Sequence, residues 1–159
     1  MPRVRIVAER TIPAPAAAVY ALLADYREGH PSVLPPAFSD FTVLDGGTGA
    51  GTHIRFTLTL GRRTQETEGF AAEPEPGRVL TETYPPSNMV TTFTVDPDGD
   101  GSRLRIESVW ESRPGIAGFF ERFIAPRLLM PLYRDELDLI VQWAQRRELK
   151  NSGPSPPTR

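Results

Sequence analysis

The stretch PGIAGFFERFIAPRLLMPLYRDELDLIVQWAQRREL, residues 114–149, decides the fold of this chain. Its apolar residues recur at helical spacing and predict one long helix: Phe119, Phe120, Phe123, Ile124, Leu128, Met130, Tyr133, Leu137, Ile140, Val141 and Ala144. Such a helix must bury one face, and the only large partner is a sheet built from the preceding residues. A long helix across a curved sheet encloses space, which points to a protein that holds an apolar molecule.

Two prolines interrupt this helix, Pro126 and Pro131. A proline inside a helix removes one backbone hydrogen bond and bends or breaks the helix. We therefore expect a break or kink between Ala125 and Pro131. Its favoured role is to let the helix follow the sheet, with a wider pocket mouth or a hinged lid as the alternative.

Short alternating segments precede the helix. Residues 3–12 predict a strand, and PAPAAAVYALLADY predicts a short helix, with a second short helix or loop at 27–36. The glycine-rich stretch 46–51 is interpreted as a turn with positive φ angles. Further strands are predicted at 38–44, 52–60, from Arg63 onward, 79–84, 89–95 and 104–110. A two-residue turn at Gly61-Arg62 places three pairs opposite one another: Leu60 with Arg63, Leu58 with Gln65, and Phe56 with Thr67.

Composition excludes several functions. The 159 residues fit one domain, predicted at 1–149, with a disordered polar tail at 150–159. The net charge of −2 argues against nucleic acid as a partner, and without cysteine there is no disulfide or thiolate chemistry. Two histidines make a poor metal site, so neither metal nor cofactor is predicted. Without a signal or membrane-spanning segment, we expect a cytoplasmic protein. We also expect a monomer or weak homodimer.

The chain resembles the START-like helix-grip superfamily (SRPBCC), which includes polyketide cyclases/dehydrases and the major birch-pollen allergen. The resemblance spans residues 3–147. It rests on the first strand with PAPAAAVYALLADY, the turn GGTGAGT, the DGDGSRLRIES hairpin and the closing helix. It implies an α+β fold, in which a seven-stranded antiparallel sheet curls around a long C-terminal helix, with two short helices after the first strand. It also implies an apolar ligand between sheet and helix.

The predicted ligand-binding residues share the inward face of the strands and helix. They are Ile54, Phe56, Leu58, Gln65, Thr67, Met89, Thr91, Phe93, Ile106, Ser108, Trp110, Phe120, Phe123, Ile124 and Leu128. The polar members of this set are candidates to orient a ligand carbonyl or hydroxyl. Arg63 is placed at the rim, while Tyr26 and His30 are placed at the pocket mouth. No catalytic residue is assigned: His30 is a candidate general base, but a loop-packing role is favoured. Asp135, Glu136 and Asp138 are interpreted as a solvated face, and His53 as an outward side chain.

Three functions stay open. The first is binding or transport of a small hydrophobic molecule such as a lipid, fatty acid or polyketide-like compound. The second is a polyketide cyclase, aromatase or dehydratase, disfavoured because no acid–base pair is predicted in the interior. The third is a regulatory module that acts through a protein partner. Converging titratable groups in a deep pocket favour the enzyme, and an exposed apolar patch on the helix favours the regulatory module.

Overall fold

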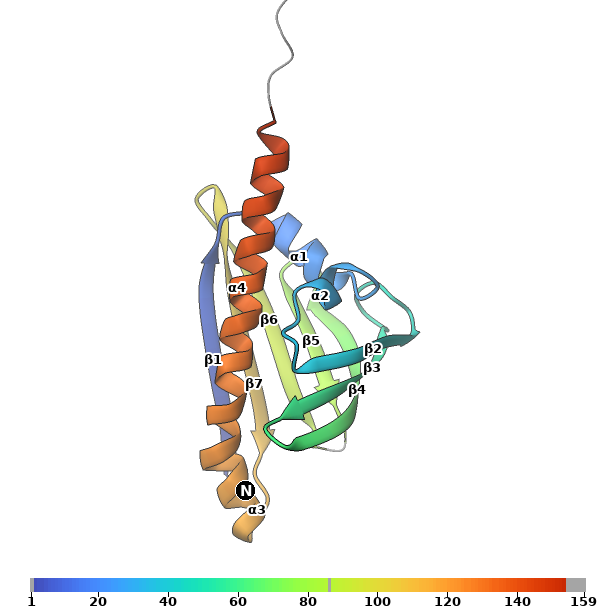
Figure 1. The fold of residues 1–159 in the computed structure, drawn as a ribbon, viewed down its shortest axis with the longest axis vertical. Helices are drawn as coiled ribbons and strands as arrows, with labels where there is room; N and C mark the ends of the chain where they lie inside the picture. The colour runs from blue at the N-terminus through green and yellow to red at the C-terminus, as the bar shows by residue number, and fades with distance from the viewer. Residues whose placement is uncertain (1, 86, 154–159) are drawn as a thin grey trace, which may run out of the picture.

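The protein consists of one curled antiparallel sheet and one long helical segment that lies along it (Figure 1). A computed structural model describes residues 2–85 and 87–153; most of the tail predicted at 150–159 lies outside these residues. The strands are β1 (Arg3–Ile12), β2 (Phe38–Asp45), β3 (His53–Leu60), β4 (Arg63–Glu75), β5 (Val79–Tyr84), β6 (Met89–Asp98) and β7 (Gly101–Glu111). The helices are α1 (Ala16–Ala24), α2 (Gly29–Ser32), α3 (Gly115–Phe119), the π-helix η1 (Phe120–Ile124) and α4 (Ala125–Asn151).

The sheet order is β1-β7-β6-β5-β4-β3-β2, and all neighbours are antiparallel. Each strand from β2 to β6 pairs with the next along the chain, as short turns require, and β1 forms one edge of the sheet beside β7. The β3–β4 register confirms the predicted pairs of Leu60 with Arg63, Leu58 with Gln65 and Phe56 with Thr67. The predicted helix-grip fold, with two short helices after the first strand, is therefore confirmed.

The core lies where α4 crosses β1, β7 and β6. Ile140 and Ala144 of α4 are buried there, as are Leu104 and Ile106 of β7 and Val95 of β6. Alternate residues of each strand point toward the helix because side chains alternate along a strand. Burial of each large apolar side chain contributes about 1.5–3 kcal/mol, so this packing stabilises the fold.

The irregular part of the long helix lies one turn earlier than predicted. The chain is α-helical from Ala125 through Pro131 to Asn151, so a break between Ala125 and Pro131 is wrong, while the alternative of a kink there stays a prediction. The departure is instead the π-helix η1, which α4 follows with Pro126 in its first turn. A proline has no N–H to donate and is tolerated in the first turn, so the regular helix begins at Ala125 and the preceding turn is wide.

The glycine-rich loop between β2 and β3 holds α1 and α2 in place. Gly46, Gly47, Gly49 and Gly51 all have positive φ, as predicted for this turn. The Gly47 carbonyl accepts a hydrogen bond from the Tyr26 amide at 2.9 Å, and the Gly49 amide donates to the Ala24 carbonyl at 2.9 Å. These contacts fix the link between α1 and α2, which carries the side chains described next.

Candidate functional site

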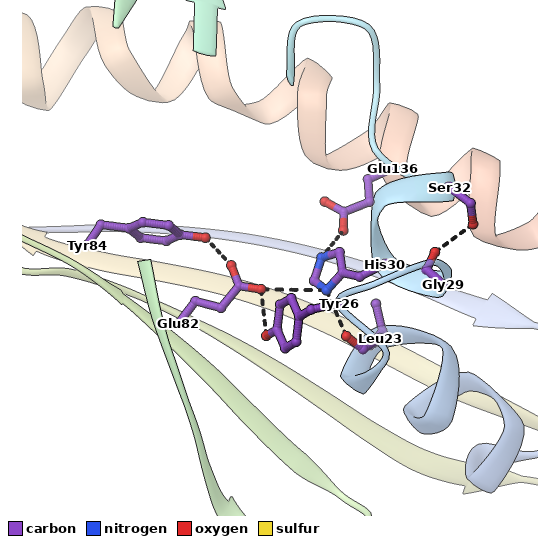
Figure 2. A network of polar contacts seen from close by, with 8 residues as sticks. All are labelled: Leu23, Tyr26, Gly29, His30, Ser32, Glu82, Tyr84 and Glu136. Carbon is purple, nitrogen blue, oxygen red and sulfur yellow. Dashed lines mark hydrogen bonds and ion pairs between the residues drawn. The ribbon is translucent and has the colours of Figure 1, made fainter. Parts of the chain in front are cut away.

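A buried polar cluster lies between the sheet and α4, and His30 is at its centre (Figure 2). Tyr26 and His30 come from the α1–α2 region, Glu82 and Tyr84 from the inner face of β5, and Glu136 from α4. We call these five residues the His30 cluster. All five are buried, although an uncompensated charge in an apolar interior costs several kcal/mol. Five polar side chains from three parts of the chain therefore meet at one point.

Glu82 is the acceptor on the sheet side of the cluster. Its Oε1 accepts a hydrogen bond from the Tyr26 hydroxyl at 2.9 Å, and its Oε2 accepts one from the Tyr84 hydroxyl. Oε1 also lies 3.6 Å from His30 Nδ1. Two hydroxyl donors and one nearby imidazole thus satisfy a carboxylate that is only 3% exposed.

Glu136 faces the other side of the imidazole. Its Oε1 lies 3.5 Å from His30 Nε2, an ion-pair distance that is longer than a good hydrogen bond. That oxygen is buried and has no hydrogen-bond partner among the described residues. His30 Nδ1 lies 2.8 Å from the Leu23 carbonyl, which can only accept, so Nδ1 carries a hydrogen. The proton that His30 gains or loses is therefore on Nε2, toward Glu136.

The charges of the cluster shift its pKa values. Burial lowers the pKa of His30, but the carboxylates of Glu82 and Glu136 and the Leu23 carbonyl outweigh it and raise this pKa to about 9. Burial raises the pKa of Glu136, and the neighbouring imidazole of His30 partly opposes that rise. Burial together with the charge of Glu82 raises the pKa of Tyr26 and of Tyr84 far above the usual range. Near neutral pH the imidazole is protonated and both tyrosines are donors.

A second set of hydrogen-bonded polar side chains lies beside the His30 cluster. Ser108 Oγ is 2.6 Å from Thr91 Oγ1 and 2.5 Å from the Tyr133 hydroxyl, and all three residues are buried. Tyr133 precedes Glu136 by one helical turn, so both lie on the inner face of α4. Burial raises the pKa of Tyr133 to about 12. Thr91 and Ser108, predicted to orient a ligand, are thus bonded to each other and to the helix.

Three interpretations of polar residues need correction. Glu136 was placed on a solvated face, but it is buried, and only its neighbours Asp135 and Asp138 are exposed. His30 was placed at the pocket mouth, but it is 3% exposed and lies in the interior, where Tyr26 is also buried. The interior does contain paired titratable groups, against the expectation that it would not. Glu82 was not identified by sequence reasoning at all.

The concave face of the sheet becomes steadily more accessible along the β3–β4 hairpin. Phe56 is buried, Leu58 and Thr67 are half-buried, and Gln65 and Arg63 are exposed, although their register places them on one face. A concave-face side chain that reaches solvent is not covered by the helix. The sheet is therefore closed at the His30 cluster and open near the tip of this hairpin.

The remaining predicted ligand-binding residues divide in the same way. Buried members are Ile54, Thr91, Phe93, Ile106, Ser108 and Trp110; half-buried members are Met89 and Ile124; exposed members are Phe120, Phe123 and Leu128. The exposed ones lie on η1 and the first turns of α4, where the Arg63 guanidinium carbon is 5.7 Å from the Phe120 ring centre. The hairpin tip and the helical segment thus meet at the open end.

Two hollows lie elsewhere on the molecule. A groove of about 420 Å³ runs between β1 and α4, lined by Val7, Ala8, Glu9, Arg10, Met130, Arg134, Leu137 and Asp138. A second, of about 270 Å³, lies beside Trp143 and Arg147 near the end of α4. Neither is lined by a predicted ligand-binding residue. Within residues 2–85 and 87–153, no group of three or more His, Asp or Glu side chains is arranged to hold a metal ion.

Comparison with known proteins gives one family. The family described as polyketide cyclase / dehydrase and lipid transport matches residues 3–144. No curated protein sequence matches the chain.

Solved structures share the fold. The chain is similar to the KanY protein (TM-score 0.80, 29% identity, covering 91% of this chain and 99% of that chain). It is also similar to the Zhui aromatase/cyclase from Streptomyces sp. R1128 (TM-score 0.79, 17% identity, 96% and 100% covered). A START superfamily protein from Mycobacterium smegmatis gives a TM-score of 0.71 at 12% identity, with 90% and 98% covered.

Proposed function

Because this chain belongs to the polyketide cyclase/dehydrase and lipid transport family, whose helix-grip fold binds hydrophobic ligands, we propose that it binds one small, largely apolar molecule against the concave face of its sheet. The ligand lies between the β3–β4 hairpin and the first turns of α4. It reaches inward toward the His30 cluster.

The accessible concave face carries this proposal. Leu58 and Thr67 are half-buried and Gln65 is exposed, on the same face as the buried Phe56. Such a face gains stability when it is covered, at about 25 cal/mol per Å² of apolar surface removed from water. A ligand that slides along this face covers apolar surface at the open end and meets polar groups at the closed end.

The polar end of the ligand follows from the charges at the closed end. Glu136 Oε1 lies 3.5 Å from His30 Nε2 and has no hydrogen-bond partner among the described residues, so it can accept a hydrogen bond from a ligand beside this ion pair. Glu82 supplies a second carboxylate within the same cluster. A neutral donor such as a hydroxyl or phenol fits there, whereas a ligand carboxylate would be repelled. Among the classes expected from the sequence, hydroxylated lipids and polyketide-like phenols therefore fit better than fatty acids.

Native mass spectrometry of the purified protein tests this proposal, together with titration of an apolar fluorescent probe. We expect one small molecule per chain or one saturable probe site, and weaker binding for Leu58→Asp. Thr57→Asp is the matched control, because Thr57 is the next residue on the opposite face of β3. A protein that carries no molecule and takes up no probe, or equal effects of the two variants, would contradict it.

One observation favours an enzyme as the second candidate. The His30 imidazole lies between two buried carboxylates, with Tyr133 one turn from Glu136 on the same helix. An imidazolium paired with a carboxylate can donate and accept protons on a bound carbonyl compound. Incubation with a polyketide-like polyketone and analysis for loss of water test this. Turnover that disappears in His30→Gln, while the probe still binds, supports the enzyme; a ligand recovered unchanged supports the binder.

A further inference from the structure

The helical segment carries an exposed apolar surface at its start. Ile116 is 91% exposed, Phe119 56% and Phe123 50%, and Phe120 and Leu128 are also exposed. We call these five residues the tip patch. In Figure 1, α3 forms one pole of the molecule, and the last turns of α4 lie at the opposite pole. Large apolar side chains gathered at such a pole indicate a surface that is covered by a partner.

Arginines border the tip patch. The guanidinium carbon of Arg122 is 5.7 Å from the Phe123 ring centre, and that of Arg63 is 5.7 Å from the Phe120 ring centre. Residues 61–64 and 111–128 together contain five arginines, all exposed: Arg62, Arg63, Arg113, Arg122 and Arg127. The same segments contain two glutamates, and one of them, Glu121, pairs with Arg113. Positive charge is thus concentrated at one pole of a chain whose net charge is −2.

We propose that the tip patch docks this protein onto the surface of a membrane that contains anionic lipids. Exposed aromatic and aliphatic side chains on a short helical turn enter the region between headgroups and acyl chains, while the arginines remain at the anionic headgroups. Among residues 2–85 and 87–153, none of the helices has the length and apolarity of a membrane span, and the proposed contact is with the bilayer surface alone. The aromatic side chains of this pole are bordered by arginines, a combination that favours an anionic lipid surface as the partner.

The tip patch lies next to the open end of the concave face, so docking would place that opening at the membrane. Arg63, which contacts Phe120, lies on the concave face two residues before the exposed Gln65. The open end of the concave face therefore adjoins the tip patch, and docking brings that opening to the lipid. A hydrophobic ligand can then pass between membrane and protein without crossing water. Only this last step rests on the proposed function; the docking itself does not.

Sedimentation with vesicles of phosphatidylcholine, with and without phosphatidylserine, tests the docking on the full chain without added ligand. We expect binding only to vesicles with phosphatidylserine, and at least tenfold weaker binding for the double variant Phe119→Ala/Phe123→Ala. Arg122→Glu/Arg127→Glu should lose the preference for phosphatidylserine. Leu149→Ala/Arg146→Glu is the matched control, because both residues are exposed at the opposite pole, and it should bind like the unchanged chain.

A depth measurement completes the test. The chain has no cysteine, so Ile116→Cys carries a single polarity-sensitive dye, and Leu149→Cys carries the same dye as a control. Emission of the dye at 116, but not at 149, should shift to the blue on vesicles with phosphatidylserine. Absence of vesicle binding would overturn the proposal. So would concentration-dependent dimers in solution that Phe119→Ala/Phe123→Ala abolishes, because the partner would then be a second copy. Probe binding to the concave face is measured separately without vesicles, so either proposal can fail alone.

Discussion

Among single residues, His30 makes the stability of the fold depend on pH, because it gains a proton more readily in the folded protein than in the unfolded chain. The pKa of His30 is about 9 in the folded protein and 6.5 for an unperturbed histidine. A raised pKa gives stability that is full below pH 6.5 and is lost as the pH rises through about 9. The difference corresponds to about 3 kcal/mol, since one pKa unit is about 1.4 kcal/mol. The raised pKa of Glu136 acts in the same direction, starting at lower pH.

Urea unfolding from pH 6 to pH 10 measures this effect. We expect the free energy of unfolding to fall as the pH rises through this window, and His30→Gln to remove most of the fall. His53→Gln is the control, because His53 is partly exposed on the outer face and pairs with Glu68. An equal slope in His30→Gln would mean that His30 does not gain a proton on folding.

The charge of Glu136 is expected to raise the pKa of His30. Replacing it by Gln removes one carboxylate 3.5 Å from Nε2, and the pKa of His30 should fall by about one unit or more. NMR titration of the imidazole measures the fall directly, because the chain has only two histidines. Asp138→Asn should leave the pKa unchanged, since Asp138 lies on the same helix but pairs with Arg10 at the surface. Equal shifts in both variants would assign the effect to the overall charge.

The burial of Glu82 and Glu136 was indicated by their spacing in the sequence, although both residue types are usually exposed. Tyr133, Glu136, Ile140 and Ala144 follow the three- and four-residue spacing of one helix face, so Glu136 belongs to the buried stripe. Glu82 alternates with Leu80 and Tyr84 on β5, which makes it an inward side chain. The spacing placed both glutamates on buried faces, but their charge favoured an exposed position, because an unpaired charge is rarely buried. The partner that permits burial, His30, lies about 50 to 100 residues away and meets them only in the fold.

Among the elements, the glycine-rich loop between β2 and β3 is expected to need glycine at position 49 for full stability. Gly49 has a φ of +59°, and a Cβ there would collide with the carboxylate of Glu73, which accepts hydrogen bonds from Tyr20 and from the Ala50 amide. Gly49→Ala should therefore lower the free energy of unfolding by about 1–3 kcal/mol. Urea unfolding measures this. Gly77→Ala is the control for positive φ alone, since nothing lies within 4 Å of its added Cβ. Equal losses in the two variants would rule out the collision as the cause.

The elements differ in how well their sequences predicted them. The β3–β4 register followed from a two-residue turn and strict alternation, because a shift by one residue would turn every apolar side chain outward. The π-helix η1 was not predicted from the sequence, because a proline shows only where a helix lacks a backbone hydrogen bond. Pro126 could be accommodated by a bend after it or by a wide turn before it, and only packing decides between them.

At the scale of the whole molecule, the fold divides into a packed half and an accessible half. The crossing of α4 over β1, β7 and β6 was predictable, since a long amphipathic helix has one large partner. For the open end of the concave face, the sequence predicted only that space lies between the helix and the curved sheet. Its polar end depends on side chains from α2, β5 and α4, which no local pattern brings together. The tip patch, apart from Ile116, appeared in the sequence as part of the helical stripe, and the end of the sheet leaves it uncovered.

The proposed function requires that an apolar ligand occupies the concave face and not the groove between β1 and α4. The two described methionines separate these sites, because Met89 is on the concave side of β6 and Met130 lines the groove. Methyl NMR of methionine-labelled protein, titrated with an apolar phenol, measures both at once. We expect saturable shifts at Met89 that Leu58→Asp weakens. Shifts at Met130 with Met89 unchanged would contradict it.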